Sequence, residues 1–208
     1  MYHLMPPASP LRPMRVSNVA LLVIDVQMDF CPGGALAVPD GDRVVPVLNT
    51  LLRLATSQGT PVYASRDWHP PRSRHFQPEG RWPIHCVVDS PGARFHPDLG
   101  LPSDVTIVSK GVAPDADGYS AFDGHLADGT ALADELHRRQ IDHLVVAGLA
   151  TDYCVKHSVL DARSLSWRVA VATDAIAPVE LAPGDGARAL EEMKTAGATL
   201  RPSEDIVW

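Results

Sequence analysis

The sequence predicts a three-layer α/β/α doubly wound domain with a mainly parallel sheet of about six strands. Short apolar runs recur along the chain, with amphipathic or irregular segments between them. Most of these runs lack the in/out alternation of a strand that is exposed on one face, as expected when helices cover both faces. The alternation of strand and helix is typical of a doubly wound fold, and 208 residues suit one such domain.

The predicted elements follow the apolar and amphipathic patterns. Strands are expected at 19–24, 61–65, 105–109, 143–148 and 168–173, with 198–200 or 205–208 as a sixth. Helices are expected at about 42–58, 130–140, 152–166 and 185–197. Pro46 is tolerable only near the first turn of its helix. Thr130 is a suitable N-cap for the second helix, and Gly197 would end the last one.

Composition and charge restrict the class of protein. The first 17 residues contain four prolines and no signal-peptide-like apolar stretch, so we expect a flexible tail at 1–17 and the folded domain at 18–208. A net charge of −7 without a Lys/Arg cluster argues against nucleic acid or an anionic membrane as partner. Three cysteines form no disulfide framework, which favours a reducing, cytoplasmic location. Assembly into a homo-oligomer is left open.

Four reactive side chains stand where predicted strands end. Asp25, Asp67 and Lys110 follow the first three strands, and Cys154 lies in the turn after the fourth. Ligands of an open parallel sheet bind at the carboxyl ends of its strands, so these side chains should meet in one cleft. An Asp at a strand end often only caps a turn, and a lone Lys is more often a surface residue. The combination therefore indicates a site.

Cys154 is expected to be a nucleophile. It falls in the first turn of a predicted helix, where free N–H groups and the helix dipole favour a thiolate. Together with Asp25 and Lys110 it suits covalent amide hydrolysis, in which Asp25 moves the thiol proton to the departing amine and Lys110 holds the anionic pair. The N–H groups of Ala150 and Cys154 would form the oxyanion hole. His157 is interpreted as a helix-face residue.

A second group of polar residues has the composition of a metal site. Asp67, His69, His75 and His85 lie within 19 residues. Asp67 and His69 are two residues apart, so they project to the same side of an extended chain. Oxygen and nitrogen ligands suit Zn, Fe or Mn, and ligand softness alone does not choose among them. The alternative is a polar loop that is merely rich in histidine, and at His75 a water or a hydrogen bond would serve as well.

Three aromatic residues, Phe30, Trp82 and Tyr119, stand near these motifs. They could stack on a flat ligand, or they could only pack the loops onto the domain. The residues alone leave both readings open.

The motifs as a group resemble one branch of a known family. They are Asp25-Val-Gln-Met-Asp-Phe-Cys-Pro-Gly-Gly34, Asp67-Trp-His69, Trp82-Pro-Ile-His-Cys86, Lys110-Gly111 and Gly148-Leu-Ala-Thr-Asp-Tyr-Cys-Val155. Over roughly residues 18–207 the chain resembles the nicotinamidase (pyrazinamidase) branch of the isochorismatase-like cysteine hydrolases. The triad motifs mark the superfamily, and the D-x-H and W-P-x-H-C pair marks the branch.

The resemblance implies a metal-dependent amidase of NAD salvage that converts nicotinamide, and also pyrazinamide, to the acid and ammonia through a cysteine thioester. It implies a catalytic triad of Asp25, Lys110 and Cys154. It also implies one divalent metal ion, zinc first and Fe or Mn otherwise, on Asp67, His69 and His85 with His75 near it. The metal would take the pyridine nitrogen or hold waters that do so.

The resemblance also implies how the substrate is held. Phe30 and Trp82 would flank the ring, and a cis peptide between Leu149 and Ala150 would aim the oxyanion N–H groups. The spacing before Tyr119 varies among members of the family, so the role of Tyr119 stays open.

Two other functions remain alternatives. The first is an amidase of the same superfamily that acts on a carbamoyl or ureido compound, although the metal motif weighs against it. The second is a non-catalytic module that binds a metal or a small ring. Loss of a triad member would favour that module, and all three members are present.

Overall fold

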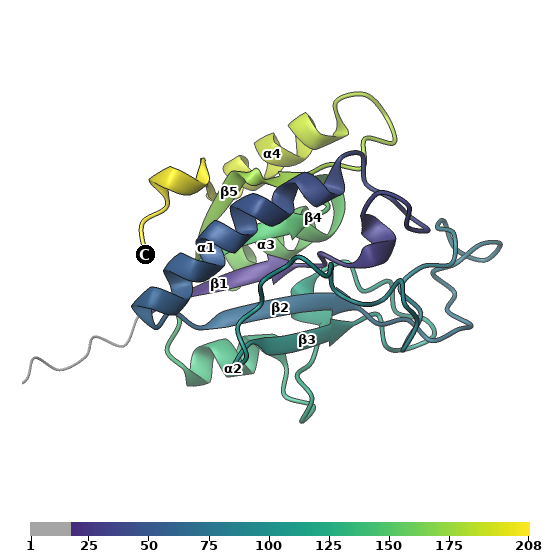
Figure 1. Cartoon of the computed structure of the whole chain (residues 1–208), viewed down its shortest axis with the longest axis horizontal. Coiled ribbons are helices and arrows are strands. Elements are labelled where there is room, and N and C mark those ends of the chain that lie inside the picture. The colour runs from purple at the N-terminus through teal and green to yellow at the C-terminus, as the bar shows by residue number, and fades with distance from the viewer. Residues whose placement is uncertain (1–17) are drawn as a thin grey trace, which may run out of the picture.

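The computed structural model describes residues 18–208, so the expected tail at 1–17 lies outside the described residues. A six-stranded, all-parallel sheet confirms the doubly wound α/β class, with strand order β3-β2-β1-β4-β5-β6 (Figure 1). The strands are β1 (Val19–Ile24), β2 (Val62–Asp67), β3 (Thr106–Lys110), β4 (His143–Leu149), β5 (Arg168–Ala177) and β6 (Thr199–Arg201).

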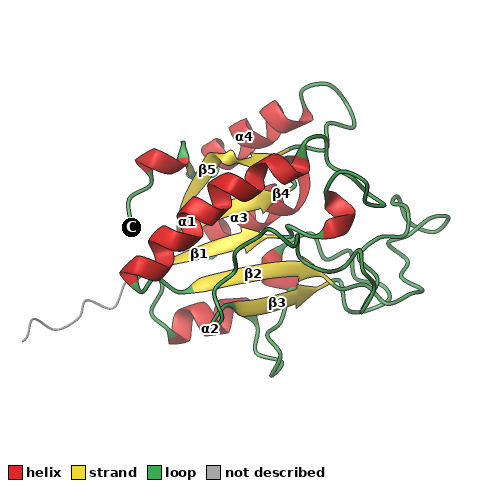
Figure 2. Ribbon diagram, viewed as in Figure 1, coloured by secondary structure: helices red, strands yellow, loops and turns green. Residues whose placement is uncertain are grey.

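Helices cover both faces of this sheet (Figure 2). One face carries α1 (Val44–Gln58), and the other carries α2 (Leu132–Arg138), α3 (Lys156–Ser164) and α4 (Asp185–Thr195). Within β1, Leu21 belongs to the core beneath α1, whereas Leu22 belongs to the core on the opposite face. All six residues of β1 are therefore buried, which explains why the strand shows no in/out alternation.

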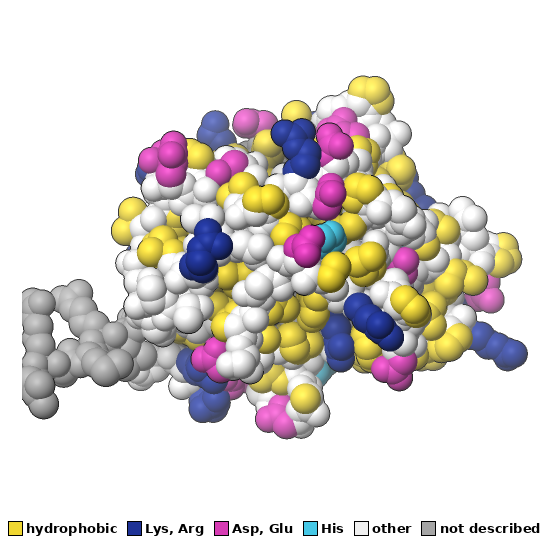
Figure 3. Space-filling view, in the orientation of Figure 1, with side chains coloured by type: hydrophobic (Ala, Val, Ile, Leu, Met, Phe, Trp, Pro, Cys, Tyr) yellow, Lys and Arg dark blue, Asp and Glu magenta, His cyan; other side chains and the backbone are white. Residues whose placement is uncertain are grey.

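No helix within residues 18–208 is both long and apolar enough to cross a membrane. On the face drawn in Figure 3, Lys and Arg side chains lie scattered among acidic and apolar ones.

Some predicted boundaries are wrong, for local reasons. The N-cap of α2 is Ala131 and not Thr130, whose N–H instead bonds the Asp128 side chain in the preceding turn. The segment predicted as a helix from residue 152 opens with a π-helical turn at Thr151–Val155, and α3 begins only at Lys156. The sixth strand is 199–201, while 205–208 forms no strand.

The topology determines where a site can form. The chain adds β2 and β3 on one side of β1, and then crosses to β4 on the other side. Ligands of such sheets bind at the carboxyl ends of the strands, beside the point where the order reverses. Asp67 and Lys110 are the last residues of β2 and β3 and are partners in register. Parts of the long loops 68–105 and 111–131 lie at this same edge, on the right of Figure 1.

Candidate active site and metal centre

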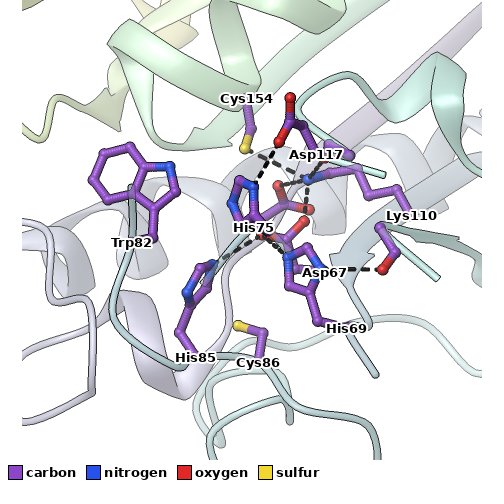
Figure 4. A network of polar contacts seen from close by, with 12 residues as sticks. Asp67, His69, His75, Trp82, His85, Cys86, Lys110, Asp117 and Cys154 are labelled. Carbon is purple, nitrogen blue, oxygen red and sulfur yellow. Dashed lines mark hydrogen bonds and ion pairs between the residues drawn. The ribbon is translucent and has the colours of Figure 1, made fainter. Parts of the chain in front are cut away.

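The Lys110 ammonium group is the centre of the candidate site (Figure 4). Its Nζ lies 2.7 Å from Asp25 Oδ2, forms an ion pair with Asp67 Oδ1, and lies 3.5 Å from Cys154 Sγ. It also donates to the Gly118 carbonyl at 2.6 Å, and its side chain is fully buried. The four strand-end residues predicted from the sequence therefore meet around one positive charge.

Burial and ion pairing set the protonation of these groups. Burial alone would lower the pKa of Lys110, but Asp25 and Asp67 together raise it well above its usual value. For Asp67, burial acts to raise the pKa, and Lys110 with the neighbouring imidazoles nevertheless holds it well below the usual range. For Asp25, burial outweighs the attraction of Lys110, and Asp67 adds to it, so its pKa is raised. Asp25 is thus the more basic carboxylate of the pair.

Two polar residues that sequence reasoning missed hold these carboxylates in place. Ser65 Oγ donates to Asp25 Oδ1 at 2.8 Å. The Gln27 amide bonds the backbone of Asp67 on both sides, accepting from its N–H at 2.8 Å and donating to its carbonyl at 2.9 Å. The only sequence signal was a polar residue inside or just after an otherwise apolar strand.

The surroundings of Cys154 oppose the thiolate that its position in the first helical turn favours. Burial raises the pKa of the Cys154 thiol well above its usual value; Lys110 opposes this, and Asp25 and Asp67 add to it. The physical reason is that one ammonium already serves two carboxylates, so a thiolate would add a second uncompensated negative charge in a dry site. The thiol is therefore protonated at rest, close to a carboxylate of raised pKa. Asp25, Asp67 and Cys154 present atoms within 4.8 Å of one another.

The three histidines of the expected metal site converge. Each of the three rings, those of His69, His75 and His85, has one nitrogen that lies within 4.8 Å of a nitrogen of each of the others. All three residues are buried. Asp67 Oδ2 lies 3.6 Å from His69 Nε2 and 3.7 Å from His85 Nε2. Asp67 therefore contacts Lys110 through one oxygen and the imidazoles through the other.

The hydrogen bonds of the rings favour metal ligation. Each Nδ1 lies near an acceptor: the Gly111 carbonyl for His69 at 3.1 Å, the Pro83 carbonyl for His85 at 2.8 Å, and Asp117 Oδ1 for His75 at 3.1 Å. A proton on each Nδ1 leaves the lone pair on Nε2, which is how metal-binding histidines are usually held. His69 Nε2 is buried with no hydrogen-bond partner within residues 18–208. This unpaired atom and the N/O donor set fit a divalent transition metal.

Gly111 is required at its position for two reasons. Its φ of +65° lies in the left-handed region that favours glycine. A Cβ there would also collide with the His69 ring, which packs against the Gly111 backbone. Any larger residue after Lys110 would displace the imidazole.

A pocket opens beside both groups. Its lining includes Cys154, Asp67, His75 and His85, and also all three aromatic residues singled out from the sequence, Phe30, Trp82 and Tyr119. Trp82 Nε1 donates to the Tyr119 hydroxyl at 2.8 Å, so these two side chains form one wall. Sequence reasoning missed Tyr153, Leu36 and Val179, which complete the lining. His157 does not line the pocket; it stacks on Tyr119 with 5.1 Å between ring centroids.

The backbone expected to form an oxyanion hole lies at the same pocket. The peptide bond between Leu149 and Ala150 is cis, as the family resemblance implied. Ala150 lines the pocket together with Cys154.

Comparisons with known proteins give matches over most of the chain. Residues 19–205 match the model of the isochorismatase domain family. The nicotinamidase of Escherichia coli (strain K12) is 46% identical over 198 residues, covering 87% of this chain and 93% of the relative. A crystal structure of the pyrazinamidase of Pyrococcus horikoshii in complex with zinc superposes with a TM-score of 0.82 at 40% identity, covering 89% of this chain and 99% of that one. PnC1 from L. infantum in complex with nicotinate gives 0.79 at 32% identity, covering 92% and 96%.

Replacement of Lys110 tests whether its ammonium group stabilises the two buried carboxylates. We expect Lys110→Met to lower the free energy of unfolding by about 3–5 kcal/mol, because two buried carboxylates lose their shared partner. Lowering the pH should shrink this loss, since the carboxylates then protonate. Denaturant unfolding measures both effects.

The matched control for this measurement is Lys194→Met. Lys194 lies 3.9 Å from Glu191, and both side chains are well exposed. This substitution should lower the free energy of unfolding by less than about 1 kcal/mol. Equal stability of the two variants would contradict the role of Lys110.

Proposed function

The chain belongs to the isochorismatase family and is a hydrolase that acts on an amide, and from this premise we propose that it hydrolyses nicotinamide to nicotinate and ammonia. We include pyrazinamide as a second substrate and a role in NAD salvage. The observation that carries the proposal is the position of Asp67, which contacts Lys110 of the triad through Oδ1 and the imidazoles through Oδ2. Asp67 thus joins the triad to the proposed metal ligands, so that the thiol and the metal would act on the same substrate.

In the first half of the reaction, Asp25 takes the thiol proton of Cys154 as Sγ attacks the amide carbonyl carbon. The raised pKa of Asp25 makes it a stronger base than an ordinary aspartate. The N–H groups of Ala150 and Cys154 donate to the oxyanion that forms. Asp25 then gives its proton to the amide nitrogen, the C–N bond breaks, and ammonia leaves a thioester on Cys154.

In the second half, water replaces ammonia. Asp25 takes a proton from the water as its oxygen attacks the thioester carbon, and the C–S bond then breaks. The thiolate regains the proton from Asp25, and nicotinate departs. Lys110 holds Asp25 in place throughout and offsets the negative charge that appears on the sulfur.

Asp67, His69, His75 and His85 would hold one divalent ion. Zinc is our first assignment, with iron or manganese as alternatives. When bound, the ion supplies a Lewis-acid contact for the nitrogen of the substrate ring. Phe30 and Trp82 flank that ring, and the contact between Trp82 and Tyr119 keeps the wall in place.

The two alternative functions are weaker. An amidase for a carbamoyl or ureido compound does not need three imidazoles beside an aromatic pocket. A non-catalytic binding module does not need a buried Asp–Lys–Cys cluster at the pocket floor.

Ammonia release tests the substrate and the nucleophile. The purified protein should release ammonia from nicotinamide and from pyrazinamide, and more slowly from ureido compounds. Cys154→Ala should lower kcat by more than about 10⁴-fold, since removal of a covalent nucleophile typically costs on the order of 10⁶-fold. Full activity of Cys154→Ala would refute the mechanism, and a preference for ureido compounds would favour the alternative amidase.

Metal removal tests the second half of the site. Elemental analysis should find one divalent ion per chain, a strong chelator should abolish ammonia release, and added zinc, iron or manganese should restore it. Cys154→Ala should keep the metal although it is inactive, whereas His85→Ala should lose both. Full activity of the metal-free protein would contradict metal dependence.

A further inference from the structure

Three consecutive residues in the loop between β3 and α2 each contact a different part of the site. Asp117 Oδ1 lies 3.1 Å from His75 Nδ1. The Gly118 carbonyl accepts from Lys110 Nζ at 2.6 Å. The Tyr119 hydroxyl accepts from Trp82 Nε1 at 2.8 Å. The contacts of Gly118 and Tyr119 concern the catalytic lysine and the pocket wall. The Asp117 side chain instead reaches an imidazole, that of His75 (Figure 4).

The three imidazoles differ in how they are held. Backbone carbonyls, which no substitution removes, accept from His69 and His85. The ring of His75 is held by a side chain. A neutral imidazole carries its proton on one of its two nitrogens. An acceptor beside Nδ1 holds the proton there, and Nε2 is then left with a free lone pair. His75 is therefore the one imidazole of the three whose orientation depends on a replaceable residue.

We propose that Asp117 is a positioning residue for the metal centre, which it serves by holding His75 with its Nε2 lone pair toward Asp67 and the other two imidazoles. The proposal rests on the proposed metal-dependent function and assigns that site a supporting residue outside the family motifs quoted above. Asp117 does not itself line the substrate pocket, and its hydrogen bond goes to His75 and to no member of the triad.

The surroundings of Asp117 separate this role from a purely structural one. Its side chain is 72% exposed, whereas that of His75 is only 4% exposed. An exposed carboxylate adds little to the stability of a fold. The loop is attached near His75 independently of the carboxylate, because the Arg74 N–H donates to the Pro114 carbonyl at 2.7 Å. Removing the Asp117 side chain should thus free the His75 ring and leave the loop in place.

The test is the zinc affinity of variants, measured by competition of the whole chain with a fluorescent chelator. Asp117→Ala should bind Zn²⁺ roughly 10–100-fold more weakly, the usual effect of losing such a partner, with its thermal unfolding midpoint unchanged. Asp117→Asn keeps an oxygen that accepts from Nδ1–H and should restore most of the affinity. Asp115→Ala removes the same charge from an exposed position of the same loop, where the carboxylate does not hydrogen-bond His75, and should bind zinc like the native protein.

A double variant tests the route of the effect. In a His75→Ala background, Asp117→Ala should cause no further loss of zinc affinity, because its partner is already gone. Cobalt loading gives a second readout: the visible absorption of bound Co²⁺ should change in Asp117→Ala and recover in Asp117→Asn.

Three outcomes would overturn the inference. They are native zinc affinity in Asp117→Ala, an equal loss in Asp115→Ala, and a loss of the same size in the His75→Ala background. If the native protein binds zinc and releases ammonia while one of these holds, only the role of Asp117 fails. If the native protein does neither, the proposed function fails with it.

Discussion

One buried ammonium group shared by two carboxylates is the constraint on which the site depends. Lys110 is the last residue of the edge strand β3, and it contacts Asp25, which directly follows β1, and Asp67 at the end of β2. Charges taken out of water are costly unless they are paired, so the three side chains hold one another in place. Asp67 and Lys110 are partners in register at the ends of β2 and β3, so the parallel pairing of these strands brings the charged side chains together.

Asp25 and Asp67 share Lys110, yet their pKa values are shifted in opposite directions. Asp67 is held anionic by Lys110 and the imidazoles, which suits a metal ligand. Asp25 has a raised pKa, which suits a group that accepts and returns a proton. Burial, together with Asp25 and Asp67, raises the pKa of the Cys154 thiol, although Lys110 opposes this rise. The proposed chemistry follows from this unequal division: one carboxylate stays charged, and the other exchanges a proton with the thiol.

The sequence predicted the fold class, because continuous apolar runs require cover on both faces of the sheet. It also predicted that the strand-end residues and the histidines meet, since parallel strands end at one edge. It did not predict the roles of Ser65, Gln27 or Asp117, because their partners lie about 40 residues away in the chain and no local pattern indicates such contacts. The helix-dipole argument for Cys154 is local and leaves out the carboxylates from other strands, which raise the pKa of the thiol.

The most direct test of the central claim is a crystal structure of the Cys154→Ala protein loaded with zinc and nicotinamide. The account predicts Lys110 between Asp25 and Asp67, the zinc ion on the other oxygen of Asp67, and the amide carbon beside position 154. A Lys110 side chain turned away from either carboxylate, or a zinc ion bound without Asp67, would contradict it.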